Sequence, residues 1–176
     1  MNFKMSSVHI KSLKILKRIS FKKKFLESKL KVKLEIKGKI ISISGSELSK
    51  YEAVQIFEAI NFGFEIETAL LLLDENYIFE IINIKNLTRR TDLSQVRARI
   101  IGRKGKTLKV LQDLTECFIK LHDNQVYIIG PAERIKDCLN GLRKLIQGSK
   151  QSSTYAYLEK QRKQPEPADL GLKIKE

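Results

Sequence analysis

The sequence predicts an α/β (α+β) chain built from two tandem copies of one small unit, each a three-stranded antiparallel sheet with helices packed on one face. Two stretches support this prediction, because each reads as strand, tight turn, strand and amphipathic helix. The second strand and the helix end at Gly45 and Gly63 in one stretch, and at Gly130 and Gly148 in the other. Both pairs are separated by 85 positions, so the stretches align without a gap and indicate a duplicated domain.

The composition indicates a soluble globular protein with a polyanionic partner. The 176 residues suffice for one ordinary domain or two small ones, and 42% of them are hydrophobic. Lys and Arg number 34 against 20 acids, which gives a net charge of +14. The charge is uneven, because residues 1–40 carry +11, residues 41–80 carry −7 and residues 81–120 carry +7. Such blocks predict a molecule with oriented charged faces.

Other classes of protein are disfavoured by residues that the chain lacks. The chain has two cysteines, Cys117 and Cys138, and two histidines, and their spacing does not match a metal site. We therefore expect no metal and no cofactor. We expect both cysteines to be small core residues. No nucleophile–base motif is present, so we expect no enzyme activity. The longest apolar run, 69–73, is too short to cross a membrane, and no signal peptide is recognisable at the N-terminus.

Periodicity places the elements of both copies. The first copy is predicted to contain a strand at 8–10, helices at 13–19 and 23–30, strands at 32–36 and 41–43, a helix whose apolar stripe is Tyr51, Val54, Phe57 and Ile60, and a leucine helix at 68–73. The second copy is predicted to contain a strand at 78–84, helices at 94–101 and 107–114, strands at 118–121 and 126–129, and a helix with the stripe Ile135, Leu139, Leu142 and Leu145.

The domain boundaries follow from a polar turn and from two prolines. Asp74, Glu75 and Asn76 form a turn between the leucine helix and the next strand. We therefore predict domains at 1–75 and 76–164. Pro165 and Pro167 predict a disordered tail at 165–176.

The most informative motif is the loop Gly102-Arg103-Lys104-Gly105, which has an apolar segment before it and a helical segment after it. Glycines allow the main chain to approach a sugar-phosphate backbone, and the two cations supply countercharge. A nucleotide-binding P-loop is excluded, because that motif needs a glycine where this chain has Ile100. The same 85-residue offset maps the loop onto 17–20, Lys-Arg-Ile-Ser, so the first copy has lost both glycines.

With its Gly-x-x-Gly loop between two helices, the second copy resembles a type I KH domain, especially over 100–108 and 128–131. The whole chain resembles a narrower family, the two-KH ribosome-assembly proteins related to the partner of the endonuclease NOB, which has archaeal members of this compact size. The matching segments are the degenerate loop at 17–20 and the residues 59–64, 69–74 and 154–162. Arg103-Lys104 departs from the Lys-Gly or Gly-Gly pair that is frequent in relatives, but both end glycines are kept.

This resemblance implies binding of single-stranded rRNA near the 3′ end of the small ribosomal subunit during maturation. It implies a NOB-type endonuclease and the pre-ribosomal subunit as partners, in the cytoplasm, or in the nucleus or nucleolus of a eukaryote, and no membrane. Besides the loop itself, the candidate RNA-binding residues are Arg97, Arg99, Lys106, Lys109 and Lys120 for phosphates, and Val96, Ile100, Ile101, Ile119 and Leu121 along a groove for bases.

Two alternatives remain open at this point. The chain could be another KH factor, such as a sister factor of the small-subunit processome or a subunit of an RNA-degradation complex, although no S1-like barrel is visible. It could instead be a protein scaffold that uses the acidic helix face at 47–67 of the first domain. Tyr155 and Tyr157 could stack on bases, but they align with leucines of the first copy, which favours packing.

Overall fold

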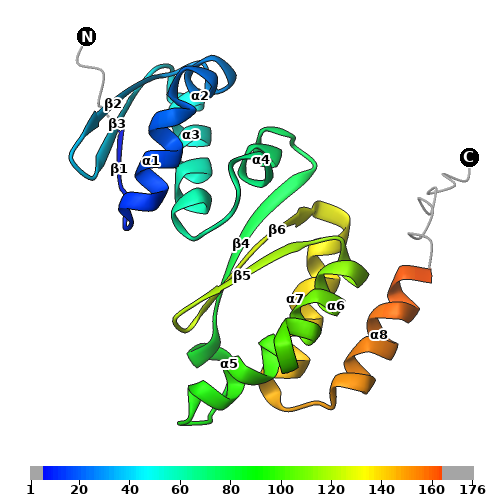
Figure 1. Ribbon diagram of the computed structural model, residues 1–176. Coiled ribbons are helices and arrows are strands. Elements are labelled where there is room, and N and C mark those ends of the chain that lie inside the picture. The colour runs from blue at the N-terminus through cyan, green and yellow to red at the C-terminus, as the bar shows by residue number, and fades with distance from the viewer. Residues whose placement is uncertain (1–5, 164–176) are drawn as a thin grey trace, which may run out of the picture. The chain divides into compact units, whose positions relative to one another are not determined.

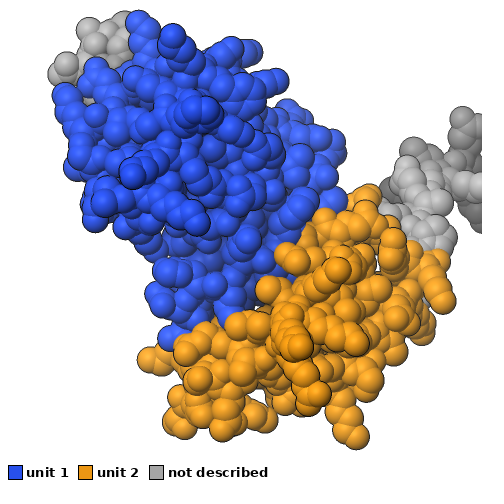
Figure 2. All heavy atoms as spheres, viewed as in Figure 1, with its two compact units in different colours: residues 1–83, 118–132 blue, residues 84–117, 133–176 orange. Residues whose placement is uncertain are grey.

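The computed structural model describes residues 6–163 and shows an α/β chain with two three-stranded antiparallel sheets, as predicted (Figure 1). Chain contacts divide it into two compact units, coloured in Figure 2. One unit contains the residues up to Asn83 together with Phe118–Ala132, and the other contains Ile84–Cys117 and the residues from Glu133 onward. The domain boundary near residue 75 stays a prediction, and the proposed tail at 165–176 lies outside the described residues.

The first copy forms a sheet of order β1-β3-β2, in which both neighbouring pairs of strands run antiparallel. Its helices α1, α2 and α3 lie on one side of this sheet (Figure 1). Alternation buries Leu34, Ile41 and Ile43 and sends the intervening residues outward. The elements are β1 (Ser6–His9), α1 (Leu13–Phe21), α2 (Lys23–Leu30), β2 (Lys33–Lys37), β3 (Ile40–Ser44) and α3 (Glu47–Asn61).

Two details of the first copy differ from the prediction. Tyr51 is 63% exposed, because the buried stripe of α3 is Ala53, Ile56, Phe57 and Ile60, with the i, i+3, i+4, i+7 spacing of a helix face. The leucine segment is not one α-helix. It is a single turn, α4 (Ile66–Ala69), followed by the 3₁₀ helix η1 (Leu70–Leu73).

The sheet of the second copy belongs to the first compact unit and has the order β4-β6-β5. Its strands are β4 (Tyr77–Asn83), β5 (Phe118–His122) and β6 (Gln125–Pro131). Tyr127 of β6 stacks on Phe62, which follows α3, with 3.8 Å between ring centroids. Phe79 of β4 stacks on Tyr127 and meets Phe64 edge-on. These rings join the first copy and this sheet in one hydrophobic core.

The second unit is helical in its described part. It contains η2 (Ile84–Leu87), α5 (Leu93–Ile101), η3 (Arg103–Gly105), α6 (Lys106–Thr115), α7 (Ala132–Gln147) and α8 (Gln151–Lys163). Gly141 of α7 lets Leu158 of α8 approach closely, since a Cβ there would lie 3.1 Å from a Leu158 methyl carbon. Cys117 and Cys138 are buried, as expected. None of the helices described between residues 6 and 163 has the length and apolar character needed to cross a membrane.

The backbone supports the duplication independently of residue type. Left-handed residues occur at matching positions in the two copies, 85 apart: Lys31 and Glu116, Gly38 and Asp123, Gly63 and Gly148. The other described residues with positive φ are Gly102, Lys104 and Gly105, whose counterparts in the first copy have ordinary dihedrals. The two copies therefore differ in backbone handedness at the Gly-x-x-Gly loop.

Candidate nucleic-acid interface

The loop begins where α5 ends, at Ile101, and α6 resumes at Lys106. Gly102 leaves the helix with φ 74° and ψ 174°, a conformation that is essentially restricted to glycine. Its amide donates to the carbonyl oxygen of Ala98 at 2.8 Å, and the amide of Gly105 donates to that of Gly102 at 3.1 Å. Lys104 and Gly105 are both left-handed, which turns the chain sharply into α6.

The two glycines are needed for different reasons. A Cβ at Gly102 would lie 2.1 Å from Oγ1 and 2.6 Å from Cβ of Thr107, so a buried side chain of α6 already fills this space. A Cβ at Gly105 would meet nothing within 4 Å. Gly102 is therefore required by packing inside the protein, whereas Gly105 offers open main chain to a ligand.

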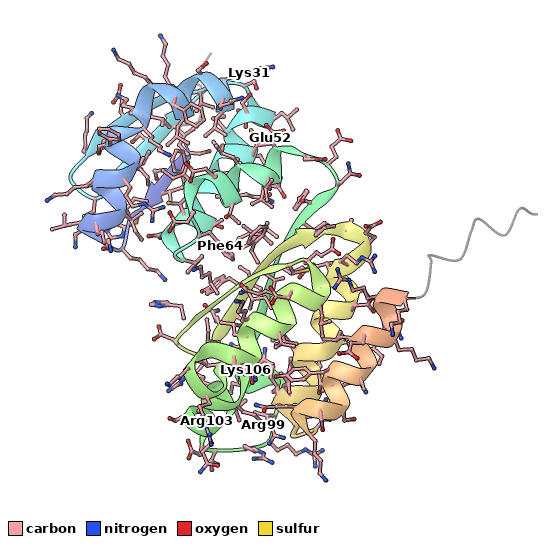
Figure 3. All side chains as sticks on the ribbon, turned by 45° about the vertical axis from the view of Figure 1, so that its right-hand side comes forward. Lys31, Glu52, Phe64, Arg99, Arg103 and Lys106 are labelled. Carbon is pink, nitrogen blue, oxygen red and sulfur yellow. The ribbon has the colours of Figure 1, made fainter. Side chains whose placement is uncertain are left out.

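The cations of the loop face solvent. Arg103, Lys104, Lys106 and Lys109 are exposed, and none of them forms an ion pair with any residue in the described part of the chain. Figure 3 labels Arg103 and Lys106 at the loop, together with Arg99 of α5. Exposed, unneutralised cations on both sides of an open glycine are a suitable surface for phosphate.

The three other predicted cations have different environments. Arg99 is half-buried, and its Nη2 donates to the carbonyl oxygens of Gly148 at 2.8 Å and Ser149 at 2.6 Å. Its guanidinium therefore anchors the chain that follows α7. Arg97 is also half-buried. Lys120 is exposed on β5, which belongs to the first compact unit.

The predicted apolar groove residues are mostly core. Val96 and Ile100 of α5 are buried, and Ile119 of β5 is 1% exposed. Ile101 is 38% exposed, and Leu121 is half-buried. The exposed apolar surface directly before the loop is therefore that of Ile101.

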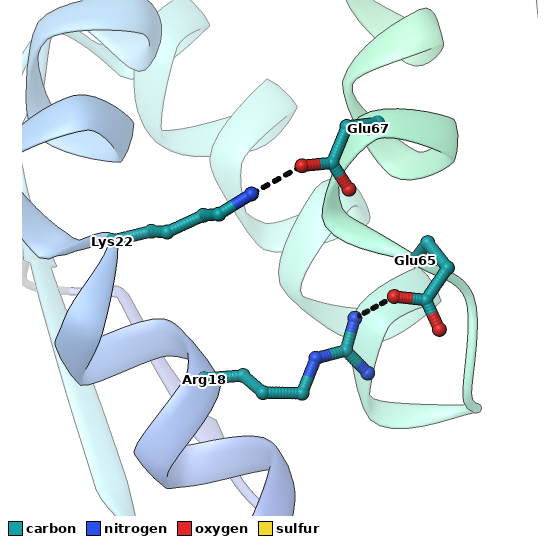
Figure 4. A network of polar contacts seen from close by, with 4 residues as sticks. All are labelled: Arg18, Lys22, Glu65 and Glu67. Atoms are coloured by element: carbon teal, nitrogen blue, oxygen red, sulfur yellow. Dashed lines mark hydrogen bonds and ion pairs between the residues drawn. The ribbon is translucent and has the colours of Figure 1, made fainter.

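The first copy has no such loop. Helix α1 continues through 17–20, Ile19 is fully buried, and α2 begins after the single residue Lys22. Arg18 pairs with Glu65 at 2.5 Å, and Lys22 pairs with Glu67 (Figure 4). The hydrogen bond from Lys22 lowers the pKa of Glu67, so this pairing persists until the pH falls below the ordinary range of a carboxyl group.

This pairing was not predicted. The partners are 47 and 45 residues apart, a separation that leaves no periodic signal in the sequence. It pairs Arg18 and Lys22 within the protein, whereas Lys17 at the same position is exposed. The first copy therefore presents less free positive charge there than the second copy does.

Tyr157 packs within the protein, as predicted. Lys144 of α7 makes a cation–π contact with its ring, with Nζ 4.8 Å from the ring centroid. Its hydroxyl accepts a hydrogen bond from Nδ2 of Asn140 at 3.4 Å. Tyr155 is half-buried on the same helix.

Two three-stranded antiparallel sheets, the helices and one intact Gly-x-x-Gly loop define a protein of the KH class. A family model for a second PNO1 domain, described as a eukaryotic type KH-domain (KH-domain type I), matches residues 78–163. A KH domain-containing protein of Methanocaldococcus jannaschii is 30% identical over 157 residues, which cover 85% of this chain and 69% of that protein. The chain belongs to this PNO1/Dim2 family of KH proteins, which confirms the family named above, while a degenerate first KH domain stays a prediction.

Two further relatives carry descriptive names. The pre-rRNA-processing protein PNO1 of Candida albicans is 30% identical over 139 residues, covering 74% of this chain and 50% of that protein. The chain thus spans half the length of this relative. The aDim2p protein of Pyrococcus horikoshii OT3 was solved in a complex with a/eIF2alpha and rRNA. It shares 31% identity and a TM-score of 0.77 with this chain, covering 91% of this chain and 94% of that one.

Proposed function

We propose that this protein is a non-catalytic assembly factor of the small ribosomal subunit, which binds single-stranded rRNA near the 3′ end through the loop Gly102–Gly105. The name of the Candida albicans relative and the rRNA in the Pyrococcus horikoshii complex support this proposal. The strong positive charge favours an RNA partner as well. The proposed compartment is the cytoplasm, or the nucleolus in a eukaryote.

The observation that carries the proposal is the contrast between the two copies at one position. In the second copy, Gly105 is open and Arg103 and Lys104 are exposed. In the first copy, the same position is helical and Arg18 is already paired with Glu65. A main chain that can touch phosphates, flanked by unpaired cations, fits the way in which KH loops hold four nucleotides.

The residues are assigned by their exposure. Arg103, Lys104, Lys106 and Lys109 would contact phosphates, and Ile101 would provide apolar surface for a base. Arg97, Ile119 and Lys120 remain predicted RNA-binding residues. Arg99 would act indirectly, because its guanidinium is bonded to main-chain carbonyl oxygens.

A protein-binding role is the second candidate function, and it belongs to the first copy. The pairing of Arg18 and Lys22 with Glu65 and Glu67 leaves this copy less suited to phosphate. On its helix α3, the carboxylates of Glu47 and Glu58 are exposed to solvent. We propose that a NOB-type endonuclease or another component of the pre-ribosomal subunit contacts this copy.

The test of RNA binding is the double substitution Arg103→Asp/Lys104→Asp. Reversing two charges at the loop should weaken binding of a single-stranded 3′-end fragment of small-subunit rRNA by at least about 100-fold at low salt, and should flatten its salt dependence. Binding is measured by fluorescence anisotropy at several salt concentrations, after circular dichroism has shown that the variants are folded.

The matched control is Lys14→Asp/Lys17→Asp, which makes the same charge change at exposed positions of α1. We expect a loss of less than about fivefold, from long-range electrostatics alone. A larger loss in the control than in the loop variant would contradict the proposal, because it would place the RNA on the first copy. A scrambled RNA of equal length separates sequence preference from charge.

A further inference from the structure

The chain between α7 and α8 is hydrogen-bonded to both helices that flank the candidate RNA loop, α5 and α6. Arg99, in the last turn of α5, donates from Nη2 to the carbonyl oxygens of Gly148 and Ser149. Gln151, the first residue of α8, donates from Nε2 to Oγ1 of Thr107 at 2.9 Å. Thr107 is the side chain that fills the space beside Gly102. Residue 150 therefore lies between Ser149, which is bonded to the helix before the loop, and Gln151, which is bonded to the helix after it.

The internal repeat shows what has changed at residue 150. The offset of 85 places Lys150 at the position of Glu65, and Arg103 at the position of Arg18. In the first copy these positions form an ion pair of 2.5 Å. In the second copy the acid is replaced by a lysine. The second copy therefore lacks the carboxylate that pairs with the arginine in the first copy, and carries a positive charge at that sequence position.

The neighbouring pair has changed in the same direction. Glu67 of the first copy, which pairs with Lys22, corresponds to Ser152. The second copy thus has neither of the two carboxylates that pair with Arg18 and Lys22 in the first copy. Lys150 is exposed, and no ion pair within residues 6–163 involves it.

We propose that Lys150 is a phosphate-binding residue of the RNA site, and that Arg99 and Gln151 hold it in place beside the loop. Its ligand is a phosphodiester group of the single-stranded RNA bound at Gly102–Gly105, so this inference rests on the proposed function. A lysine binds phosphate as a point charge on a flexible stem, and a fixed main chain limits where that charge can reach. Lys150 directly precedes helix α8, so the segment that leads into this helix contributes to the site.

The decisive variant is Lys150→Glu, which restores the charge found in the first copy. The introduced carboxylate would pair with Arg103 and repel phosphate, so binding of the rRNA 3′-end fragment should weaken by about 30-fold or more at low salt. Lys150→Ala should weaken binding by about three- to tenfold and lower the salt slope by about one. Lys150→Arg should bind like the unaltered protein, because the charge is kept.

The matched control is Lys136→Glu, the same charge change at an exposed position of α7. It should weaken binding by less than about threefold through long-range electrostatics. Equal effects of Lys150→Glu and Lys136→Glu would overturn the assignment of Lys150. In that case a large loss in Arg103→Asp/Lys104→Asp would leave the proposed function intact, whereas full binding by that double variant would contradict the function itself.

A double-mutant cycle tests the neighbourhood that the repeat predicts. Lys150→Glu should cost less RNA affinity in an Arg103→Ala background than in the unaltered protein, because the introduced carboxylate then has no loop arginine to neutralise. Strictly additive losses would contradict the placement of Lys150 beside Arg103. Thermal melting of each variant separates loss of binding from loss of fold.

Discussion

A Gly102→Ala substitution is expected to destabilise the protein and to abolish RNA binding at the loop. The added methyl would lie 2.1 Å from Oγ1 and 2.8 Å from the main-chain nitrogen of Thr107. The main chain also has φ 74° and ψ 174°, where alanine is strained. Strain and overpacking together should cost about 2–5 kcal/mol of unfolding free energy, which is measured by urea denaturation.

Gly105→Ala provides the matched comparison within the same loop. Its φ of 76° makes alanine unfavourable by about 1–2 kcal/mol, but the added methyl would meet no atom within 4 Å. The fold should therefore suffer less than in Gly102→Ala, while RNA binding should weaken because the open main chain is covered. If Gly105→Ala bound rRNA normally, the main chain at Gly105 would not be the surface that phosphate approaches.

These two substitutions also show where sequence reasoning reached its limit. The motif identifies both glycines, but it cannot distinguish a glycine that admits a ligand from one that admits the protein's own Thr107. That distinction depends on how α6 is oriented after the turn, and hence on the left-handed Lys104. A motif records which residue type is needed, and not which neighbour makes it necessary.

The regular elements were predictable because their signals are local. The bounds of α2 and the strand pair β2–β3 follow from periodicities of 3.6 and 2 within a few residues. The leucine run 70–73 carries no such alternation, and its 3₁₀ geometry was missed. The prediction that Tyr51 lies on the buried stripe of α3 was wrong. Tyr51 has the helical spacing of that stripe, but the smaller residue Ala53 is the one that is buried.

Long-range pairs were hidden for a different reason. The pair Arg18–Glu65 joins a helix to a segment 47 residues later, and only the folded chain brings them together. The repeat nevertheless contains a readable signal, since an acid of the first copy is replaced by Lys150 in the second. Comparing charges across a duplication, as well as hydrophobic patterns, would have identified this position from the sequence.

Tyr127→Ala is expected to be strongly destabilising. Tyr127 is 1% exposed, and its ring stacks on Phe62 and lies against Phe79. Truncating a buried aromatic side chain typically costs about 3–5 kcal/mol through lost burial and the cavity that remains. The loss should appear in urea denaturation as a lower midpoint, and the slope should stay unchanged if the first copy and the sheet β4-β6-β5 still unfold together.

Two further variants isolate the contribution of the ring. Tyr127→Phe removes only the hydroxyl that donates to Gln125, and should cost about 1 kcal/mol. Burial raises the pKa of Tyr127, so this hydroxyl stays protonated well above neutral pH and remains a donor. Phe21→Ala removes an aromatic ring that is 90% exposed and should change stability by less than about 0.5 kcal/mol.

The order of these three losses decides what the aromatic cluster does. If Tyr127→Ala cost no more than Tyr127→Phe, the hydroxyl and not the stacked ring would hold β6 against Phe62. If the transition of Tyr127→Ala split into two steps, the ring would be the link that makes the first copy and the second sheet one cooperative core. Burial of the whole ring, with its centroid 3.8 Å from that of Phe62, favours a large loss in a single step.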